Sequence, residues 1–140
     1  MLVASFAVAH AQQPPNDVDL RAAYCLPIVN EQVTVFQSGQ SGQPLPPQAE
    51  KAVKEMAADA QARSDHLKRY LLPRIPYLDA TALAAAAAQG KEDSQRGQQD
   101  TAQCFSSCER DANPRQCLSS CTTETMTRVR RCTKLDWLPF

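Results

Sequence analysis

The chain has few aromatic residues, few histidines and no surplus of charge. Aromatic side chains make up 6% of its 140 residues, and Val and Ile, which favour strands, are sparse. Basic and acidic residues balance to a formal net charge of +0, which gives no argument for nucleic acid or another strongly charged partner. Ala, Gln, Arg and Ser are prominent instead. This composition favours an all-α protein.

Side chains that commonly carry catalysis are also scarce. His66 is the only histidine beyond the first eleven residues. Ser64 and Asp65 stand beside it, but three neighbours on one helical turn cannot form a catalytic triad because adjacent side chains diverge. No set of convergent titratable groups is evident. We therefore expect no enzymatic activity and no cofactor.

Long apolar runs are absent, and the longest apolar stretch lies at the N-terminus. Residues 2–9 are apolar, and Ala9 and Ala11 are the small residues that precede a signal cleavage site. Residues 1–11 therefore resemble an export signal, although no Lys or Arg precedes the apolar stretch, so the true start can lie upstream of Met1. The alternative is a buried N-terminal helix. We expect a periplasmic or secreted protein that does not span the membrane.

Proline and glycine divide residues 12–140, which we expect to form a single helical domain, a bundle of three to four helices that contains a disulfide-stapled antiparallel hairpin. A first helix should begin near Asp17 or Asp19, and Pro27 should either kink or split it, or lie within one continuous helix. Residues 38–47 are rich in Gly, Ser and Pro and predict a flexible linker. A second helix should run from about Pro47 to Leu72.

A third helix should begin after Asp79, a candidate N-cap, and reach about Arg110. Gly90 and Gly97 lie inside it, on nearly the same face. These glycines either permit close approach of another helix or interrupt this one.

The strongest helix start in the chain is at Asn113, which is followed by Pro114 and, three residues after the cap, Gln116. This is a capping-box pattern. We expect the helix to continue to about Thr133, and the apolar tail after it to pack onto the other helices.

Six cysteines are the most informative residues of the chain. An even number of cysteines in an exported chain implies three disulfides. Cys104 and Cys108 form one Cx3C couplet, and Cys117 and Cys121 form a second. The i to i+4 spacing places both sulfurs of a couplet on one face of a helix.

An antiparallel helical hairpin fixes how these cysteines pair, because facing residues share one midpoint. The outer and inner cysteines share a midpoint between residues 112 and 113, where the Asn113 signal independently predicts a turn. Two cysteines then remain and should pair with each other. The expected disulfides are Cys104–Cys121, Cys108–Cys117 and Cys25–Cys132.

The segments Cys104-Phe-Ser-Ser-Cys108 and Cys117-Leu-Ser-Ser-Cys121 resemble the twin Cx3C hairpins of small Tim-type mitochondrial intermembrane-space chaperones, and more loosely the coiled-coil-helix-coiled-coil-helix class. In that family the outer and inner cysteines pair in the same way. The resemblance implies a role in holding or assembling other polypeptides. It covers the two couplets only, and the eight-residue separator is shorter than is usual there.

The same four cysteines offer an alternative, a tetrathiolate zinc site. We favour disulfides because an exported compartment is oxidising and no CxxC spacing is present.

A basic and aromatic cluster near the C-terminus is a candidate partner surface. Its alternative interpretation is that the basic residues simply complement the negative end of a helix. We expect the protein to bind, or to be an accessory subunit of, another protein of the cell envelope; a small apolar-ligand-binding or chaperone-like role is the alternative. The candidate surface comprises Arg128, Arg131, Lys134, Trp137 and Phe140.

Overall fold

The computed structural model describes residues 12–40, 44–121 and 124–139. Its α-helices are α1 (Asp17–Gln40), α2 (Pro47–Leu71), α3 (Ala80–Cys108), α4 (Pro114–Ser119) and α5 (Glu124–Arg130), and a 3₁₀ turn, η1 (Ile75–Tyr77), follows α2. Within the described residues no strand is formed, and Gln13 and Leu78 make one isolated bridge. The predicted all-α, disulfide-stapled class is confirmed. The predicted signal, residues 1–11, lies outside the described residues.

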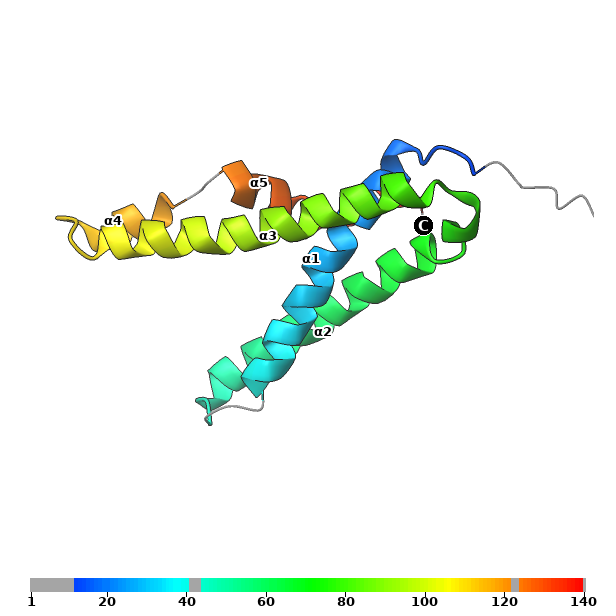
Figure 1. The fold of residues 1–140 in the computed structure, drawn as a ribbon. Coiled ribbons are helices and arrows are strands. Elements are labelled where there is room, and N and C mark those ends of the chain that lie inside the picture. The colour runs from blue at the N-terminus through cyan, green and yellow to red at the C-terminus, as the bar shows by residue number, and fades with distance from the viewer. Residues whose placement is uncertain (1–11, 41–43, 122–123, 140) are drawn as a thin grey trace, which may run out of the picture.

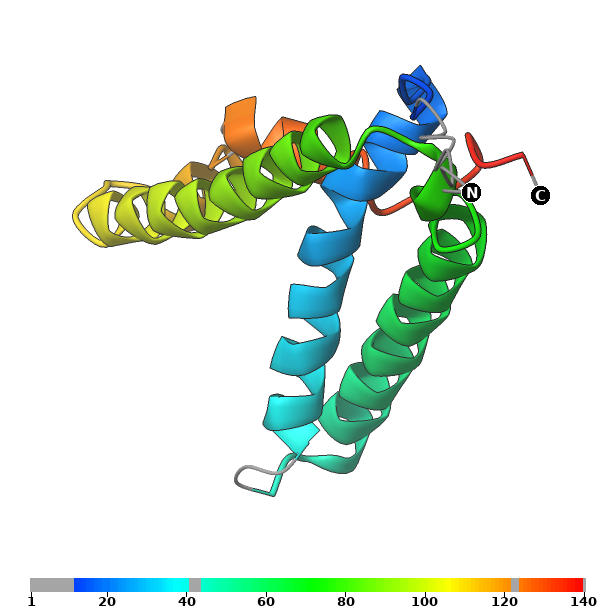
Figure 2. The same cartoon turned by 45° about the vertical axis from the view of Figure 1, so that its right-hand side comes forward.

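Two arms diverge from one joint (Figure 1). Helices α1 and α2 form an antiparallel hairpin, and α3 crosses α1 and then runs away from it. Helices α4 and α5 lie along α3, and Figure 2 shows the same separation from a second direction. We call α1 with α2 the hairpin arm, and the C-terminal half of α3 with α4 the stapled arm.

The hydrophobic core lies at the joint, because the buried apolar residues come from the parts of the chain that meet there. The C-terminal tail contributes Leu138, with Leu135 and Trp137 packed against it, so the expected packing of the tail is confirmed. The buried apolar cluster comprises Ala22, Ala23, Cys25, Ile28, Val29, Leu67, Tyr70, Leu71, Leu78, Leu83, Cys132 and Leu138.

Helix α1 begins at Asp17, as the sequence predicts, and the residue before it, Asn16, is its cap. The backbone N–H of Asp19 donates to Oδ1 of Asn16 at 2.8 Å, and the backbone N–H of Asn16 donates to Oδ2 of Asp19 at 3.0 Å. This reciprocal pair is a capping box built from Asn and Asp. The carboxylate of Asp19 therefore helps to fix the helix start.

Asp19 also binds residues at the end of α2, close to the joint. Its side chain is buried, and it accepts hydrogen bonds from Nε and Nη2 of Arg74, at 2.6 and 3.0 Å, and from the hydroxyl of Tyr70 at 2.8 Å. These bonds, with the Arg74 guanidinium first, lower the pKa of Asp19. The network ties the start of α1 to the end of α2.

Pro27 lies inside α1 without dividing it. A proline in a helix interior removes one hydrogen bond and costs about 3 kcal/mol. The next two residues, Ile28 and Val29, are both buried in the core, so tertiary packing holds the helix together at this point. Residues 38–40 of the predicted linker continue α1, residues 44–46 lie outside any helix, and residues 41–43 lie outside the described part.

Helix α3 is continuous through Gly90 and Gly97 and ends at Cys108, slightly before the expected Arg110. Asp79 caps it, accepting a hydrogen bond from the backbone N–H of Thr81 at 3.0 Å. The two glycines therefore do not break the helix.

The expected last helix is wrong in its length. Asn113 caps α4 as predicted, accepting from the backbone N–H of Gln116, but α4 ends at Ser119 and α5 is a separate helix. The sequence from 119 to 123, Ser-Ser-Cys-Thr-Thr, consists of weak helix formers. The hydroxyls of Ser119 and Ser120 both donate to the carbonyl of Gln116, which competes with continuation of the helix.

Candidate functional site

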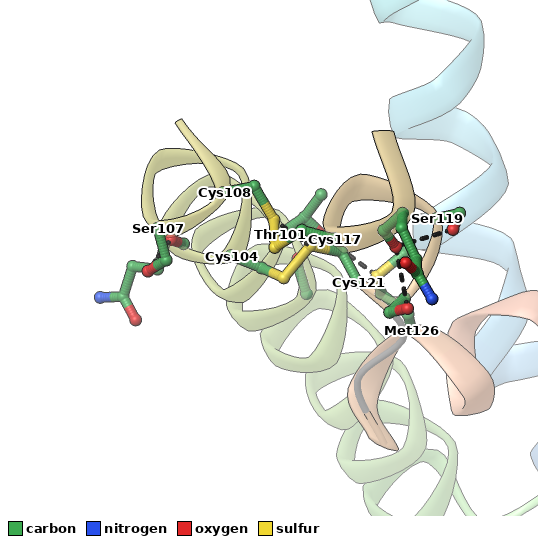
Figure 3. Close-up of a disulfide and its surroundings, with 12 residues drawn as sticks. Thr101, Cys104, Ser107, Cys108, Cys117, Ser119, Cys121 and Met126 are labelled. Carbon is green, nitrogen blue, oxygen red and sulfur yellow. Dashed lines mark hydrogen bonds between the residues drawn. A yellow bond between two sulfur atoms is a disulfide. The ribbon is translucent and has the colours of Figure 1, made fainter. Parts of the chain in front are cut away.

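Two disulfides staple α4 and the segment directly after it to the end of α3 (Figure 3). Cys104 and Cys108 lie one turn apart on α3, and their partners are Cys121 and Cys117. The Cα atoms are 5.8 Å apart in the outer pair and 5.5 Å apart in the inner pair. These are the two pairs predicted from the shared midpoint.

The third disulfide, Cys25–Cys132, lies in the core and joins α1 to the segment after α5. Both residues are 0% exposed, their Cα atoms are 5.3 Å apart, and 107 positions separate them in the chain. This bridge fixes the C-terminal segment against the joint. Together with the two staples it connects both arms covalently.

The staples also bring three sulfurs close together, those of Cys104, Cys108 and Cys121, within 4.8 Å of one another. Zinc binds thiolate sulfur, and a disulfide supplies none. The tetrathiolate alternative therefore applies only to a reduced form of the chain, and it remains a hypothesis about that form.

An apolar groove of about 500 Å³ lies in the angle between the two arms. We call it the crook groove. Its first wall is a stripe along α1, formed by Ile28, Glu31, Gln32, Val35 and Phe36. Its second wall is a stripe along α3, formed by Ser94, Gly97, Gln98, Thr101, Ala102 and Phe105. Helix α5 closes one side with Met126, Val129 and Arg130.

Large apolar side chains of the crook groove are open to solvent. Val35 is 55% exposed and Phe105 is 47% exposed. Phe105 lies between the cysteines of its couplet, which face α4, so it must face elsewhere on the helix. The sequence therefore contains a signal for this residue, although Phe105 is not among the predicted site residues. Nothing in the sequence indicates that Val35 and Phe36 lie opposite it.

Polar bonds between lining residues of the crook groove link the two arms. The carboxylate of Glu31 accepts from the hydroxyl of Ser94 at 2.7 Å and from Nε2 of Gln98 at 3.0 Å. Because Glu31 is on α1 and its two donors are on α3, these bonds hold the arms at one opening. Arg130 stands exposed at the rim.

The residues of the predicted partner surface divide between several roles. Arg128 points to buried Asp93, with 3.3 Å between Nε and Oδ2, and also pairs with Glu124 at 3.5 Å. The guanidinium of Arg21 lies over the ring of Trp137, with 4.6 Å between Cζ and the ring centroid. Nε1 of Trp137 donates a hydrogen bond to the carbonyl of Lys134. Phe140 lies outside the described residues. Arg128 and Trp137 thus make contacts within the protein itself.

Arg128 and Arg131 instead line a second pocket, of about 640 Å³, together with Arg21. We call it the arginine pocket. Sequence reasoning misses Arg21, because this residue is far from the other two in the chain and no local pattern connects them. The other residues of this pocket are Leu20, Tyr24, Cys25, Ala86, Gln89 and Asp93.

Asp93 is a buried carboxylate at the base of the arginine pocket. It accepts from the hydroxyl of Tyr24 at 2.7 Å and from Nε2 of Gln89 at 2.9 Å, and it pairs with Arg128. Burial of the phenol, helped by its bond to Asp93, raises the pKa of Tyr24 far above the ordinary value of 10. The carboxylate of Asp93 thus holds the guanidinium of Arg128 in place.

No helix within the described residues combines the length and apolar character needed to cross a membrane. Comparison of the chain with protein-family models, with curated proteins and with solved structures finds no match. The likeness of the two couplets to twin Cx3C hairpins therefore remains a local resemblance of the motif.

Proposed function

We propose that this chain is an exported, non-enzymatic binding protein of the periplasm or another space outside the cytosol, whose crook groove holds an amphipathic helix of a partner protein. The observation that carries the proposal is the groove itself. It is apolar, open to solvent and built on two arms that are covalently connected. Three disulfides are typical of oxidising compartments, which supports export.

The shape of the crook groove favours a helical segment. The α3 wall runs from Ser94 to Phe105, which is roughly 16 Å along the helix axis, or three turns. The α1 wall runs from Ile28 to Phe36 and has the same three-four spacing. A partner helix of about three turns would place apolar side chains at i, i+3, i+4 and i+7 against these two stripes.

The rim of the crook groove indicates the charge of the partner. Arg130 is exposed there, whereas the carboxylate of Glu31 is already bonded to Ser94 and Gln98. Glu31 keeps its negative charge because both donors are neutral, but its oxygens are already occupied. Arg130 forms no ion pair within the described residues and is free to meet a charge on the partner. An acidic residue beside the apolar face of the partner helix would complement it.

Rigidity is what the disulfides add to this function. A groove that already has its bound shape avoids the entropy cost of ordering two helices when the partner binds. In small proteins with few aromatics, disulfides supply the stability that the core does not. The two staples hold the α3 wall, and the Cys25–Cys132 bridge holds the α5 side.

The test uses paired variants that differ only in where the apolar side chains stand. Val35→Ser with Phe105→Ser alters the groove. Leu72→Ser with Tyr77→Ser, which are 57% and 71% exposed outside it, is the matched control. Proteins captured from the native envelope are quantified by mass spectrometry for wild type and both variants, and a synthetic peptide from the partner's amphipathic segment is then titrated against each.

We expect the groove variant to lose at least tenfold in peptide affinity and the control to keep the wild-type value. Equal binding by all three proteins would overturn the proposal, as would the absence of any partner that depends on the groove. The alternative role, binding of a small apolar ligand, predicts a bound small molecule in native mass spectra of protein from its own compartment. The groove variant would lose that molecule and the control would keep it.

A further inference from the structure

The arginine pocket is separate from the crook groove and shares no lining residue with it. Three arginines from distant parts of the chain line it, namely Arg21 of α1, Arg128 of α5 and Arg131 just after α5. Arg131 directly precedes Cys132, and Cys25 also lines the pocket. The buried disulfide therefore fixes the arginines relative to one another.

The charges of the arginine pocket do not balance. Asp93 offers one negative charge at its base, and Arg128 meets it there at 3.3 Å. Glu124 is the other carboxylate near Arg128, at 3.5 Å, but its side chain is 88% exposed and screened by water. Within the described residues, neither Arg21 nor Arg131 has an ion-pair partner. Two of the three arginines that line the pocket therefore carry positive charges without a matching negative charge.

The guanidinium of Arg21 is held in a position that suits anion binding. It stacks on the ring of Trp137, with 4.6 Å between Cζ and the ring centroid. Stacking uses the face of the guanidinium and leaves the N–H donors at its edge free. Those donors form a planar fork that matches the oxygens of a carboxylate or a phosphate.

Part of the remaining lining of the arginine pocket is apolar. Leu20, Ala86 and the Cys25 side chain lie beside the arginines. Its volume of about 640 Å³ is in the range of small-molecule sites, about 300 to 1,000 Å³. A ligand for it should therefore carry an anionic head and a compact apolar body.

We propose that the arginine pocket is a binding site for a small organic oxyanion, a carboxylate or phosphate monoester with an apolar body, gripped by Arg21 and Arg131 while Arg128 stays on Asp93. The anion replaces water at the two unpaired guanidinium groups, and the body covers Leu20 and Ala86. Binding should depend on the Cys25–Cys132 disulfide, which holds Arg131 in place.

The test is calorimetric titration of the full oxidised chain at low salt with four probes: octanoate, phenyl phosphate, inorganic phosphate and the uncharged octanamide. The variants are Arg21→Gln and Arg131→Gln, and the control is Arg130→Gln. Arg130 is exposed and adjacent to Arg131 in the chain, but it lines the crook groove. The control therefore removes the same charge from the neighbouring position.

We expect octanoate or phenyl phosphate to bind, and octanamide to bind at least tenfold more weakly. Arg21→Gln and Arg131→Gln should each lower the affinity for the charged probe at least tenfold. Arg130→Gln should stay within twofold of wild type. Preference for octanoate assigns a carboxylate ligand, and preference for phenyl phosphate assigns a phosphate monoester. If inorganic phosphate bound as tightly as octanoate or phenyl phosphate, this result would contradict the proposed contact between the pocket and an apolar body of the ligand.

Two other outcomes would overturn the proposal. One is that no charged probe binds at millimolar concentration, and the other is that Arg130→Gln weakens binding as much as Arg131→Gln does. The thermal midpoint of each variant is measured in parallel, so that a loss of binding is assigned to the site only where the fold is intact. Since Arg131 is exposed and makes no ion pair within the described residues, its variant should fold normally.

Discussion

The carbonyl oxygen of Tyr24 occupies the space that a Cβ atom on residue 90 would need. The backbones of α1 and α3 are therefore in direct contact where the two helices cross. Only glycine fits at this position of α3, although glycine weakens a helix interior by about 1 kcal/mol. Gly90 thus sets the crossing point from which the two arms diverge.

Replacement of Gly90 by alanine should destabilise the protein. The atom in the way belongs to the backbone of α1, which cannot rotate aside as a side chain can, so the helices must separate. Overpacking of this kind costs about 1–3 kcal/mol, and it should outweigh the gain in helix propensity. Urea unfolding followed by circular dichroism measures the change.

Gly97→Ala is the control for this prediction. Gly97 lies on the same helix but lines the crook groove, so propensity alone should favour alanine there. A Gly90→Ala protein as stable as wild type would show that the helices do not meet so closely.

Removal of the buried disulfide should cost more stability than removal of one staple. Cys25→Ala with Cys132→Ala opens a loop of 107 positions. Cys108→Ala with Cys117→Ala opens a loop of only 9 positions, and the Cys104–Cys121 disulfide still closes the larger loop that contains it. In the chain-entropy model, closure of a hundred-residue loop contributes about 4.7 kcal/mol. Guanidinium unfolding of both double variants compares them, and equal losses would contradict this ordering.

The stability of the protein should fall in acid through Asp19. Arg74 and the other donors lower its pKa below 3.8, so the folded state favours the charged carboxylate. This contribution is present above the unfolded pKa and is lost as the pH falls through the folded value. Asp19→Asn should lose about 1–3 kcal/mol at neutral pH, because Arg74 is 42% exposed and water screens part of the pair.

The same variant should also respond less to pH between about 5 and 2, measured by urea midpoints across that range. Asp65→Asn, at an exposed position of α2, serves as the control and should keep the wild-type slope. A wild-type slope in Asp19→Asn would show that other groups cause the acid sensitivity.

Two tyrosines should resist ionisation in base. Burial and a bond to a carboxylate raise the pKa of Tyr24, and burial beside Asp19 does the same for Tyr70. Neutral phenol is favoured in the folded state, so its contribution is complete below the ordinary pKa of 10 and is lost as pH rises through the folded value. Ultraviolet titration of native and denatured protein should show two delayed tyrosines, and Tyr24→Phe should remove one of them.

Much of the secondary structure is encoded locally and could be predicted. Asp79 and Asn113 cap helices within one turn of themselves, and the spacing of the couplets fixes the hairpin disulfides. The capping box that begins at Asn16 is equally local, but its Asn and Asp depart from the usual Ser or Thr followed by Glu or Gln, so the sequence did not predict it. Local rules leave the outcome at Pro27 open, and packing of the neighbouring residues decides it, because it outweighs the lost hydrogen bond.

The arrangement of the arms depends on contacts between residues that are far apart in the chain. Arg63 interrupts the apolar pattern of α2, and its guanidinium donates to Gln32 of α1 and to the carbonyl of Cys132. Asp93 looks like one more polar residue of α3 but is buried under Tyr24. No local pattern predicts such partners, so neither the crook groove nor the arginine pocket could be predicted from the sequence.

The most direct test of the disulfide-locked architecture is non-reducing peptide mapping of protein from its own compartment, with free thiols alkylated at harvest. Chymotrypsin can separate the members of each couplet, because Phe105 and Leu118 lie between them and are 47% and 43% exposed. Cleavage at Phe105 and Leu118 leaves Cys108 and Cys117 together on the peptide 106–118. Two linked peptide pairs are therefore expected, joining Cys25 to Cys132 and Cys104 to Cys121, together with one peptide that is bridged internally by Cys108–Cys117. A peptide linking Cys104 to Cys117, or six alkylated thiols, would contradict the account.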